Sequence, residues 1–265
     1  MTANNEDDGD ECALVTGASS GIGRELCRLL AEDGHNVVVV ARRRKRLEEL
    51  ADELESKFDV TVLVETADLS EPNAPSALFD RLAERGVQVD ILVNNAGFGT
   101  QGAFWELDRQ QELDQIQVNA TALADLTRLA VEPMVERGRG KILNIASTAA
   151  FQAGPFMSTY YATKSFVLHF TEGLAYELRG TGVSATVHCP GATETEFAQK
   201  AGNDDSLLFK AADVATPEAV ARHAYRSMQR EKTVAVHGFM NKVAACLTRL
   251  APRRAIRWLT AKLNR

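Results

Sequence analysis

Short apolar runs alternate along the chain with longer segments in which apolar residues recur at helical spacing. The apolar runs, rich in valine, isoleucine and leucine, lie at residues 12–16, 36–41, 60–66, 89–94, 140–146 and 183–188, with a weaker one at 233–236. The helical patterns lie at 22–33, 44–57, 73–85, 108–137, 159–179 and 217–230. Strands without strict polar alternation, separated by helices, predict a parallel sheet covered on both faces. We therefore expect an α/β fold with a doubly wound parallel β-sheet of about seven strands, which binds ligands at the carboxyl ends of those strands.

The pattern predicts one domain with a segment of different character at each end. Residues 1–10 are acidic and predict a flexible tail, residues 11–240 hold the predicted strands and helices, and residues 241–265 form a basic amphipathic extension. With 265 residues, of which 45% are hydrophobic and 25% charged, the chain can bury one large core. Its net charge of −6 gives no indication of nucleic-acid binding.

A glycine-rich run, Thr16-Gly17-Ala18-Ser19-Ser20-Gly21-Ile22-Gly23, joins the first predicted strand to the first predicted helix. Glycines at such a turn let the backbone approach a pyrophosphate, and the helix N-terminus offers free N–H groups and the positive end of its dipole. The spacing Gly-x-x-x-Gly-x-Gly departs by one residue from the three-glycine dinucleotide fingerprint. A tight turn without a ligand therefore stays an alternative.

Tyr160 and Lys164 lie four residues apart in a predicted helix, which places both side chains on one face. The lysine ammonium can favour the phenolate and lower the pKa of the tyrosine toward neutrality. A tyrosine of lowered pKa can exchange a proton with an alcohol or a carbonyl oxygen. Tyr161 lies three residues from Lys164, and we interpret it as a packing residue.

The order and separations of these motifs resemble the classical short-chain dehydrogenase/reductase family, together with Asp68-Leu69, Asn94-Asn95-Ala96-Gly97, Asn119, Ser147 and Pro190-Gly191-Ala192-Thr193-Glu194-Thr195. The resemblance covers residues 11–240 and implies a Rossmann-like fold that interconverts a carbonyl compound and an alcohol by hydride transfer. A non-catalytic dinucleotide-binding regulator and a nucleotide-sugar epimerase or dehydratase on the same fold stay alternatives. The intact set of Ser147, Tyr160 and Lys164 argues against the regulator.

The resemblance assigns catalysis to Asn119, Ser147, Tyr160 and Lys164. Tyr160 would give a proton to the substrate carbonyl while Ser147 polarises its oxygen. Lys164 would also bind the nicotinamide ribose, and Asn119, inside the long helix predicted at 108–137, would hold a proton-relay water.

Cofactor binding is expected at the ends of the predicted strands. The candidate residues are Gly17, Ser19, Ser20, Gly21, Ile22, Gly23, Arg42, Arg43, Asp68, Leu69, Asn94, Ala96, Gly97, Tyr160, Lys164, Pro190, Gly191, Thr193 and Thr195. The second strand ends at Ala41, followed by Arg42, where an acid would bind both ribose hydroxyls and repel a 2′-phosphate. Arginine removes that repulsion and offers a bidentate phosphate partner, which predicts NADP(H) as the cofactor.

Ser147 and Tyr160 are expected in the substrate pocket, with the segment 192–215 beside it. The predicted lining residues of this pocket are Phe98, Phe151, Phe156, Met157 and Phe197. These aromatic side chains indicate an apolar carbonyl substrate or, equally, core packing. The sequence does not distinguish a ketone, an aldehyde, a sugar, a steroid or an acyl thioester.

Cysteine and histidine form no recognised metal-ligand motif, so no metal is predicted, and the four cysteines are interpreted as reduced thiols. No apolar stretch has the length needed to span a bilayer, and the acidic N-terminus differs from a signal peptide. We therefore expect a cytoplasmic protein.

The extension at 241–265 carries seven basic residues and no acidic one, interleaved with apolar residues, and Pro252 divides it into two short amphipathic helices. A basic amphipathic end can lie on an anionic membrane. We prefer packing on a neighbouring subunit or at the substrate mouth, because proteins of the family it resembles are usually homodimers or homotetramers.

Overall fold

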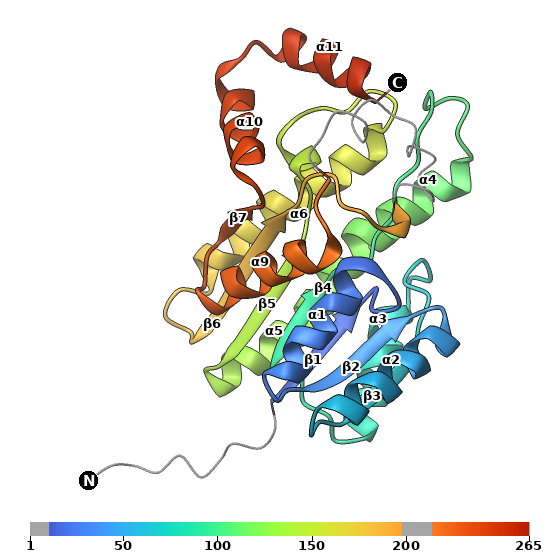
Figure 1. Cartoon of the computed structure of the whole chain (residues 1–265), viewed down its shortest axis with the longest axis vertical. Coiled ribbons are helices and arrows are strands. Elements are labelled where there is room, and N and C mark those ends of the chain that lie inside the picture. Colours follow the sequence, from blue (N-terminus) through green and yellow to red (C-terminus); the bar gives the residue numbers. More distant parts are fainter. Residues whose placement is uncertain (1–10, 198–213, 265) are drawn as a thin grey trace.

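Parallel strands form one sheet in the computed structural model, which describes residues 11–197 and 214–264 (Figure 1). The strands are β1 (Cys12–Thr16), β2 (Asn36–Ala41), β3 (Val62–Thr66), β4 (Ile91–Asn94), β5 (Gly140–Ile145), β6 (Val183–Cys189) and β7 (Val234–Val236). Their order in the sheet is β3-β2-β1-β4-β5-β6-β7, and each neighbouring pair is parallel. Strands β2 and β3 are added on one side of β1, and strands from β4 onward on the other side. The switch point between β1 and β4 is where ligands bind in sheets of this kind. The predicted doubly wound, Rossmann-like sheet is confirmed.

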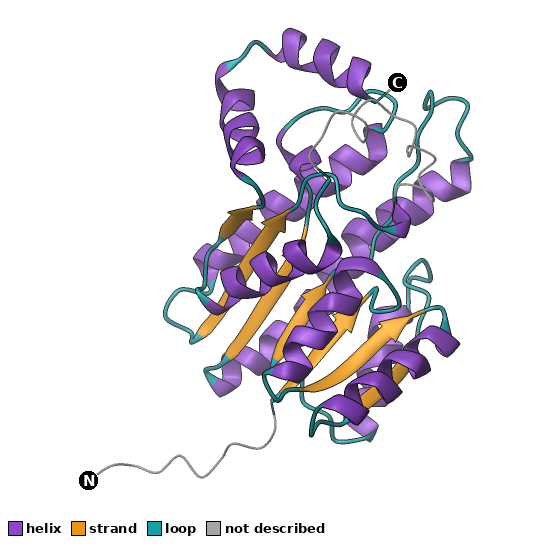
Figure 2. Cartoon of the chain, viewed as in Figure 1, coloured by secondary structure: helices purple, strands orange, loops and turns teal. Residues whose placement is uncertain are grey.

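Helices cover both faces of the sheet (Figure 2). They are α1 (Gly21–Glu32), α2 (Arg44–Lys57), α3 (Ala74–Glu84), α4 (Arg109–Ile116), α5 (Ala122–Arg137), α6 (Ser158–Glu177), α9 (Pro217–Gln229), α10 (Phe239–Leu250) and α11 (Arg253–Leu263). One core lies between the sheet and α1, α2 and α9. A second lies between the opposite face and α3, α5 and α6.

Alternate residues of the central strands enter the two cores. In β1, Ala13 and Val15 pack with the first core while Leu14 packs with the second. In β2, Val39 packs with the first core and Val40 with the second. Both faces therefore require apolar side chains, which is the physical reason why the strands show no polar alternation in the sequence.

The single helix predicted at 108–137 is interrupted. The structure has α4, then a π-helical turn η1 (Gln117–Thr121), then α5. A π-turn inserts a wider hydrogen-bonded ring into a helix, and such turns occur often at functional sites. This one carries Asn119, one of the predicted catalytic residues.

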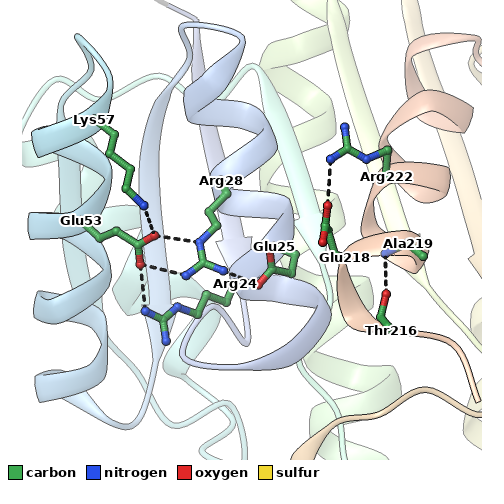
Figure 3. A network of polar contacts seen from close by, with 9 residues as sticks. All are labelled: Arg24, Glu25, Arg28, Glu53, Lys57, Thr216, Glu218, Ala219 and Arg222. Atoms are coloured by element: carbon green, nitrogen blue, oxygen red, sulfur yellow. Dashed lines mark hydrogen bonds and ion pairs between the residues drawn. The ribbon is translucent and has the colours of Figure 1, made fainter.

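The N-terminal half of α1, which follows the glycine-rich run, is fixed to α2 by a half-buried carboxylate (Figure 3). Glu53 on α2 accepts hydrogen bonds from Arg24 at 2.9 Å, from Arg28 at 2.9 and 3.0 Å, and from Lys57 at 2.9 Å. The hydrogen bonds from Arg28 above all lower the pKa of Glu53 to about 2. The carboxylate is therefore ionised across the physiological pH range and keeps both arginines of α1 in place.

Two predictions concern residues that the structure does not describe, or describes only in part. The acidic tail at 1–10 lies outside the described residues, as does most of the substrate segment predicted at 192–215.

The division of the extension by Pro252 is confirmed, because α10 ends before this residue and α11 begins after it. Within the described residues, no helix combines the length and the apolar character that crossing a membrane requires.

Candidate active site

A cavity of about 510 Å³ lies at the carboxyl ends of the strands. Most of the predicted site residues line it. They are Gly17, Ser19, Ser20, Gly21, Ile22, Arg42, Arg43, Asp68, Leu69, Ala96, Gly97, Ser147, Tyr160, Lys164, Pro190, Gly191, Thr193, Thr195 and Phe197. The carboxyl ends of six strands thus bring segments that are far apart in the sequence to one cavity.

Five predicted residues do not line the cavity: Gly23, Asn94, Asn119, Phe151 and Phe156. Phe151 packs against a hydrophobic core cluster instead. Asn94 is buried, and its Nδ2 donates to Thr127 Oγ1 and to Asn144 Oδ1, each at 3.0 Å. It therefore ties β4 to α5 and β5 rather than facing the cavity. Phe156 adopts a φ of 67°, and its carbonyl accepts a hydrogen bond from the backbone of the loop after β4.

The glycine-rich turn after β1 requires glycine for steric reasons. Gly17 has a φ of +68°, and a Cβ there would lie 2.7 Å from the Nδ2 of Asn95. A Cβ on Gly23 would lie 2.5 Å from the carbonyl oxygen of Gly17. The turn thus folds back on the start of α1 and on the loop after β4, which leaves the backbone of the turn open toward the cavity.

Asn95 holds the two loops together, although we did not predict a role for its side chain. Its Nδ2 donates to the carbonyl of Thr16 at 3.0 Å, and the backbone N–H groups of Asn95 and Ala96 donate to Thr16 Oγ1 at 3.0 Å. Asn95 also lines the cavity. The sequence feature that could have indicated this role is the position of Asn95 within the motif Asn94-Asn95-Ala96-Gly97.

The glycine-rich turn and the arginines after β2 lie side by side in the lining of the cavity. The first turn of α1 contains no acidic residue. Arg43 donates to Ser19 Oγ at 2.9 Å and to Ser20 Oγ at 3.0 Å, so its guanidinium lies against the glycine-rich turn. Arg42 is more exposed and lies 3.7 Å from a carboxylate oxygen of Asp68.

The Glu196 carboxylate also faces these arginines, although no local sequence pattern predicts this contact. Its Oε2 accepts a hydrogen bond from Arg43 Nη1 at 2.7 Å, and its Oε1 accepts one from Arg46. Glu196 lines the cavity together with Arg43. The charge of Arg43 is therefore balanced by an acid that follows β6, far from β2 in the sequence.

Ser147 and Tyr160 meet at the floor of the cavity. Ser147 follows β5, and its Oγ accepts a hydrogen bond from the backbone N–H of Ala149 at 3.1 Å, which caps a short 3-10 helix, η2 (Thr148–Phe151). Burial raises the pKa of Tyr160 above its ordinary value, while a hydrogen bond with the Ser147 side chain acts in the opposite direction. Tyr160 is thus protonated at neutral pH and able to donate.

Lys164 is held at the end of β5 by its ammonium group. Its Nζ donates to the carbonyl of Ile145 at 2.8 Å and lies 5.8 Å from the centroid of the Tyr160 ring. Burial lowers the pKa of Lys164 to about 8. The prediction that Lys164 lowers the pKa of Tyr160 is therefore wrong for this structure, because burial of the phenol outweighs an ammonium that is itself buried and directed at the end of β5.

Asn119 lies behind the loop that follows β4. Its Oδ1 accepts from the backbone N–H of Phe98 at 3.1 Å, and its Nδ2 donates to Phe98 O at 2.8 Å and to Thr163 Oγ1 at 3.2 Å. A Cβ on Gly97 would lie 3.0 Å from Asn119 Oδ1 and 3.5 Å from Lys164 Nζ. The π-turn therefore places Asn119 on the same side of Gly97 as Lys164. The role of Asn119 in holding a relay water stays a prediction.

Apolar side chains line the far end of the cavity. Phe98, Met157 and Phe197 belong to the lining, and the Phe197 ring centroid lies 5.1 Å from that of Tyr160. Thr260 and Leu263 of α11 complete this wall. We did not predict the α11 residues individually, because nothing local in the sequence indicates that the end of the chain returns to β5 and α6.

The residue after α11 anchors that wall. Asn264 is buried, its Nδ2 donates to the carbonyl of Pro155 at 2.9 Å, and its Oδ1 accepts from the Tyr161 hydroxyl at 3.1 Å. Tyr161 is therefore a packing residue that links the helix of Tyr160 to the C-terminal segment. Over residues 11–197 and 214–264, no cluster of three or more histidine, cysteine or acidic side chains has an arrangement that could hold a metal ion.

Comparison with known proteins agrees with this geometry. Residues 11–206 match the short chain dehydrogenase family. The chain is 31% identical to the ketoacyl reductase HetN of Nostoc over 239 residues, which cover 89% of this chain and 81% of that protein. It is 31% identical to the NADP-dependent 3-hydroxy acid dehydrogenase of Schizosaccharomyces pombe over 234 residues, which cover 84% and 88%. A solved structure of a short-chain dehydrogenase from Sphingobium yanoikuyae in complex with NADPH is similar, with a TM-score of 0.81, 34% identity, and coverage of 91% of this chain and 94% of that one. The chain therefore belongs to the short chain dehydrogenase family.

Proposed function

We propose that this protein is an NADP(H)-dependent oxidoreductase that reduces a carbonyl compound to an alcohol, with Tyr160 as the proton donor. The observation that carries the proposal is the pair of hydroxyl groups, Ser147 and Tyr160, which share a hydrogen bond in the cavity that also holds the glycine-rich turn. Two hydroxyl groups that meet beside an apolar wall can hold one carbonyl oxygen between them.

The residues of the cavity fit a dinucleotide. The backbone of Gly17 and Gly21, which lines the cavity, and the first turn of α1 would hold the pyrophosphate, since helix N-termini bind anions. Arg42 and Arg43 would hold a 2′-phosphate, because no acidic residue directly follows β2. The NADPH complex of the Sphingobium relative and the name of the Schizosaccharomyces relative support this choice of cofactor.

The proposed reaction needs one proton donor and one hydride donor. NADPH, when bound, supplies the hydride to the carbonyl carbon. Tyr160, protonated at neutral pH, transfers its phenolic proton to the carbonyl oxygen, which Ser147 polarises. Lys164, which lines the same cavity, would bind the nicotinamide ribose.

The lining supports an apolar carbonyl substrate. Phe98, Met157, Phe197 and Leu263 belong to the lining, and the Phe197 ring lies against that of Tyr160. A substrate with an aliphatic or aromatic body would bury its surface there, while its carbonyl group would be the part that meets polar side chains.

Substitution of the proton donor tests the proposal. With NADPH consumption measured across a set of apolar ketones and aldehydes, Tyr160→Phe should lower the rate about 10³-fold and leave NADPH affinity unchanged. The matched control is Tyr161→Phe, which loses a hydroxyl from the adjacent residue. A loss of activity confined to Tyr161→Phe would refute the assignment. Tight binding of NADPH without turnover of any carbonyl compound would favour the dinucleotide-binding regulator instead.

A further inference from the structure

Helices α10 and α11 form a C-terminal arm, residues 239–263, that stands apart from the sheet. Figure 1 shows α10 leading away from the end of β7 and α11 turning back above the carboxyl ends of the strands. Among the side chains of these two helices, only Ala245 and Thr260 are fully buried. Most of the surface of the arm therefore faces away from the described part of the molecule.

The outer face of α10 is apolar. Phe239, Met240, Leu247 and Leu250 are 55–82% exposed. At 100° per residue these positions fall within one sector of the helix, so they form a continuous exposed apolar stripe. Large apolar side chains gathered on one exposed face indicate a surface that binds something, since scattered ones would need no explanation.

Basic side chains border this stripe and continue along α11. The exposed basic residues of the arm are Lys242, Arg249, Arg253, Arg254, Arg257 and Lys262. No acidic residue occurs between positions 239 and 264, although the chain as a whole has a net charge of −6. The arm is therefore a positive surface on an acidic protein, and it is complementary to an anionic partner.

Trp258 on α11 adds a residue type that favours a boundary between water and lipid. It is 61% exposed, and the Lys262 ammonium lies 3.9 Å from its ring centroid. Leu259, beside it, is 54% exposed. Tryptophan and lysine together suit the headgroup region, where the ring lies at the apolar side and the ammonium meets phosphate.

We propose that the C-terminal arm binds the surface of an anionic membrane, with the stripe of α10 and Trp258 entering the headgroup region. Among possible occupants, a second copy of this chain is disfavoured by charge. A two-fold contact of arm against arm would bring the basic borders of both arms close together, so that Arg249 would lie near the positive charges of the other arm. A bilayer that contains anionic lipid satisfies both the apolar stripe and the basic border.

This mode of binding leaves the cavity intact. Thr260 and Leu263 lie on the side of α11 that lines the cavity, whereas Trp258 and the arginines are exposed. Membrane binding therefore does not depend on catalysis. Reduction of a water-soluble carbonyl compound in the absence of lipid tests the proposed function separately.

The first experiment measures binding of the full chain to vesicles. Vesicles of phosphatidylcholine alone should bind weakly, whereas vesicles with about a third phosphatidylglycerol should bind the protein and release it at high salt, because the surface potential is screened. Absence of binding to the anionic vesicles would overturn the proposal.

Charge variants test the position of the site. Arg253→Gln, Arg254→Gln and Arg257→Gln combined should weaken vesicle binding about 100-fold, since each basic residue near an anionic surface contributes roughly a factor of five. A matched control removes the same charge from exposed arginines elsewhere: Arg109→Gln, Arg139→Gln and Arg230→Gln. Equal weakening by the two triple variants would overturn the assignment to the arm.

The apolar stripe and the tryptophan give two further measurements. Phe239→Ser with Leu250→Ser should lower vesicle binding without changing the subunit number in light scattering. A lower subunit number with unchanged vesicle binding would instead identify a subunit contact and overturn the proposal. Because the chain has only two tryptophans, Trp105→Phe leaves Trp258 as the reporter, whose emission should move to shorter wavelength on anionic vesicles.

Discussion

Replacing Lys164 with methionine should make the protein more stable at neutral pH while it removes activity. Lys164 is 6% exposed, and burial lowers its pKa from the ordinary value of 10.5 to about 8. That difference corresponds to a cost of roughly 3 kcal/mol at pH 7, because the ammonium is favoured in the unfolded chain. Methionine has a similar length and no charge to bury.

The lost hydrogen bond opposes this gain. Lys164 Nζ donates to the carbonyl of Ile145, and an unpaired buried acceptor costs about 1–2 kcal/mol. The expected net stabilisation by Lys164→Met at pH 7 is therefore about 1–2 kcal/mol.

The dependence on pH distinguishes this reasoning from a simple packing effect. Folded Lys164 loses its proton near pH 8 and the unfolded chain near 10.5, so between these values the unfolded state binds more protons and the wild type gains stability as the pH rises. The wild type should gain roughly 1.4 kcal/mol between pH 7 and pH 9, and the variant should lack this gain.

Urea unfolding at pH 7 and pH 9, followed for the wild type and Lys164→Met, measures these differences. Lys45→Met serves as the control because Lys45 is exposed. The reasoning is refuted if Lys164→Met is less stable at pH 7 and follows the same pH dependence as the wild type.

Three further predictions follow from single contacts. Arg42→Ala and Arg43→Ala should each weaken NADPH binding by about 1.5–3 kcal/mol with little effect on NADH, and equal losses for both cofactors in a titration would contradict a 2′-phosphate site. Gly154→Ala should lower the free energy of unfolding by about 1–3 kcal/mol, because a Cβ would lie 2.1 Å from the Tyr161 ring; an unchanged urea midpoint would contradict that packing. Burial, and then His223, lowers the pKa of His188 to about 3, so stability should fall by about 1.4 kcal/mol per pH unit as the pH drops below about 6.5. His188→Gln should make the loss of stability with falling pH less steep in acid unfolding. An unchanged slope would contradict its assignment to the buried imidazole of His188.

The sheet could be predicted because its causes are local. Strands with two buried faces, such as β1 and β2, need apolar side chains at successive positions, and the sequence shows them directly. The glycine-rich turn could be predicted for the same reason, since Gly17 must adopt a positive φ wherever the rest of the chain lies.

Other features depend on contacts that no local pattern encodes. The helical spacing of Tyr160 and Lys164 correctly indicates a shared face, but the direction of the Lys164 ammonium is decided by the carbonyl of Ile145 on another element. Glu196 meets Arg43 only because the ends of β2 and β6 approach the same cavity. The π-turn around Asn119 interrupts a helical pattern that is otherwise continuous in the sequence.

The wall supplied by α11 bears on how proteins with this architecture can diverge. Thr260 and Leu263 line the cavity from a helix outside the sheet, whose side chains are otherwise mostly exposed. Substitutions at these two positions can alter the shape offered to a substrate without disturbing strand register or the two cores. Substitutions in this helix can therefore change substrate specificity during evolution with little loss in the free energy of unfolding. The hydroxyl pair and the glycine-rich turn stay unchanged.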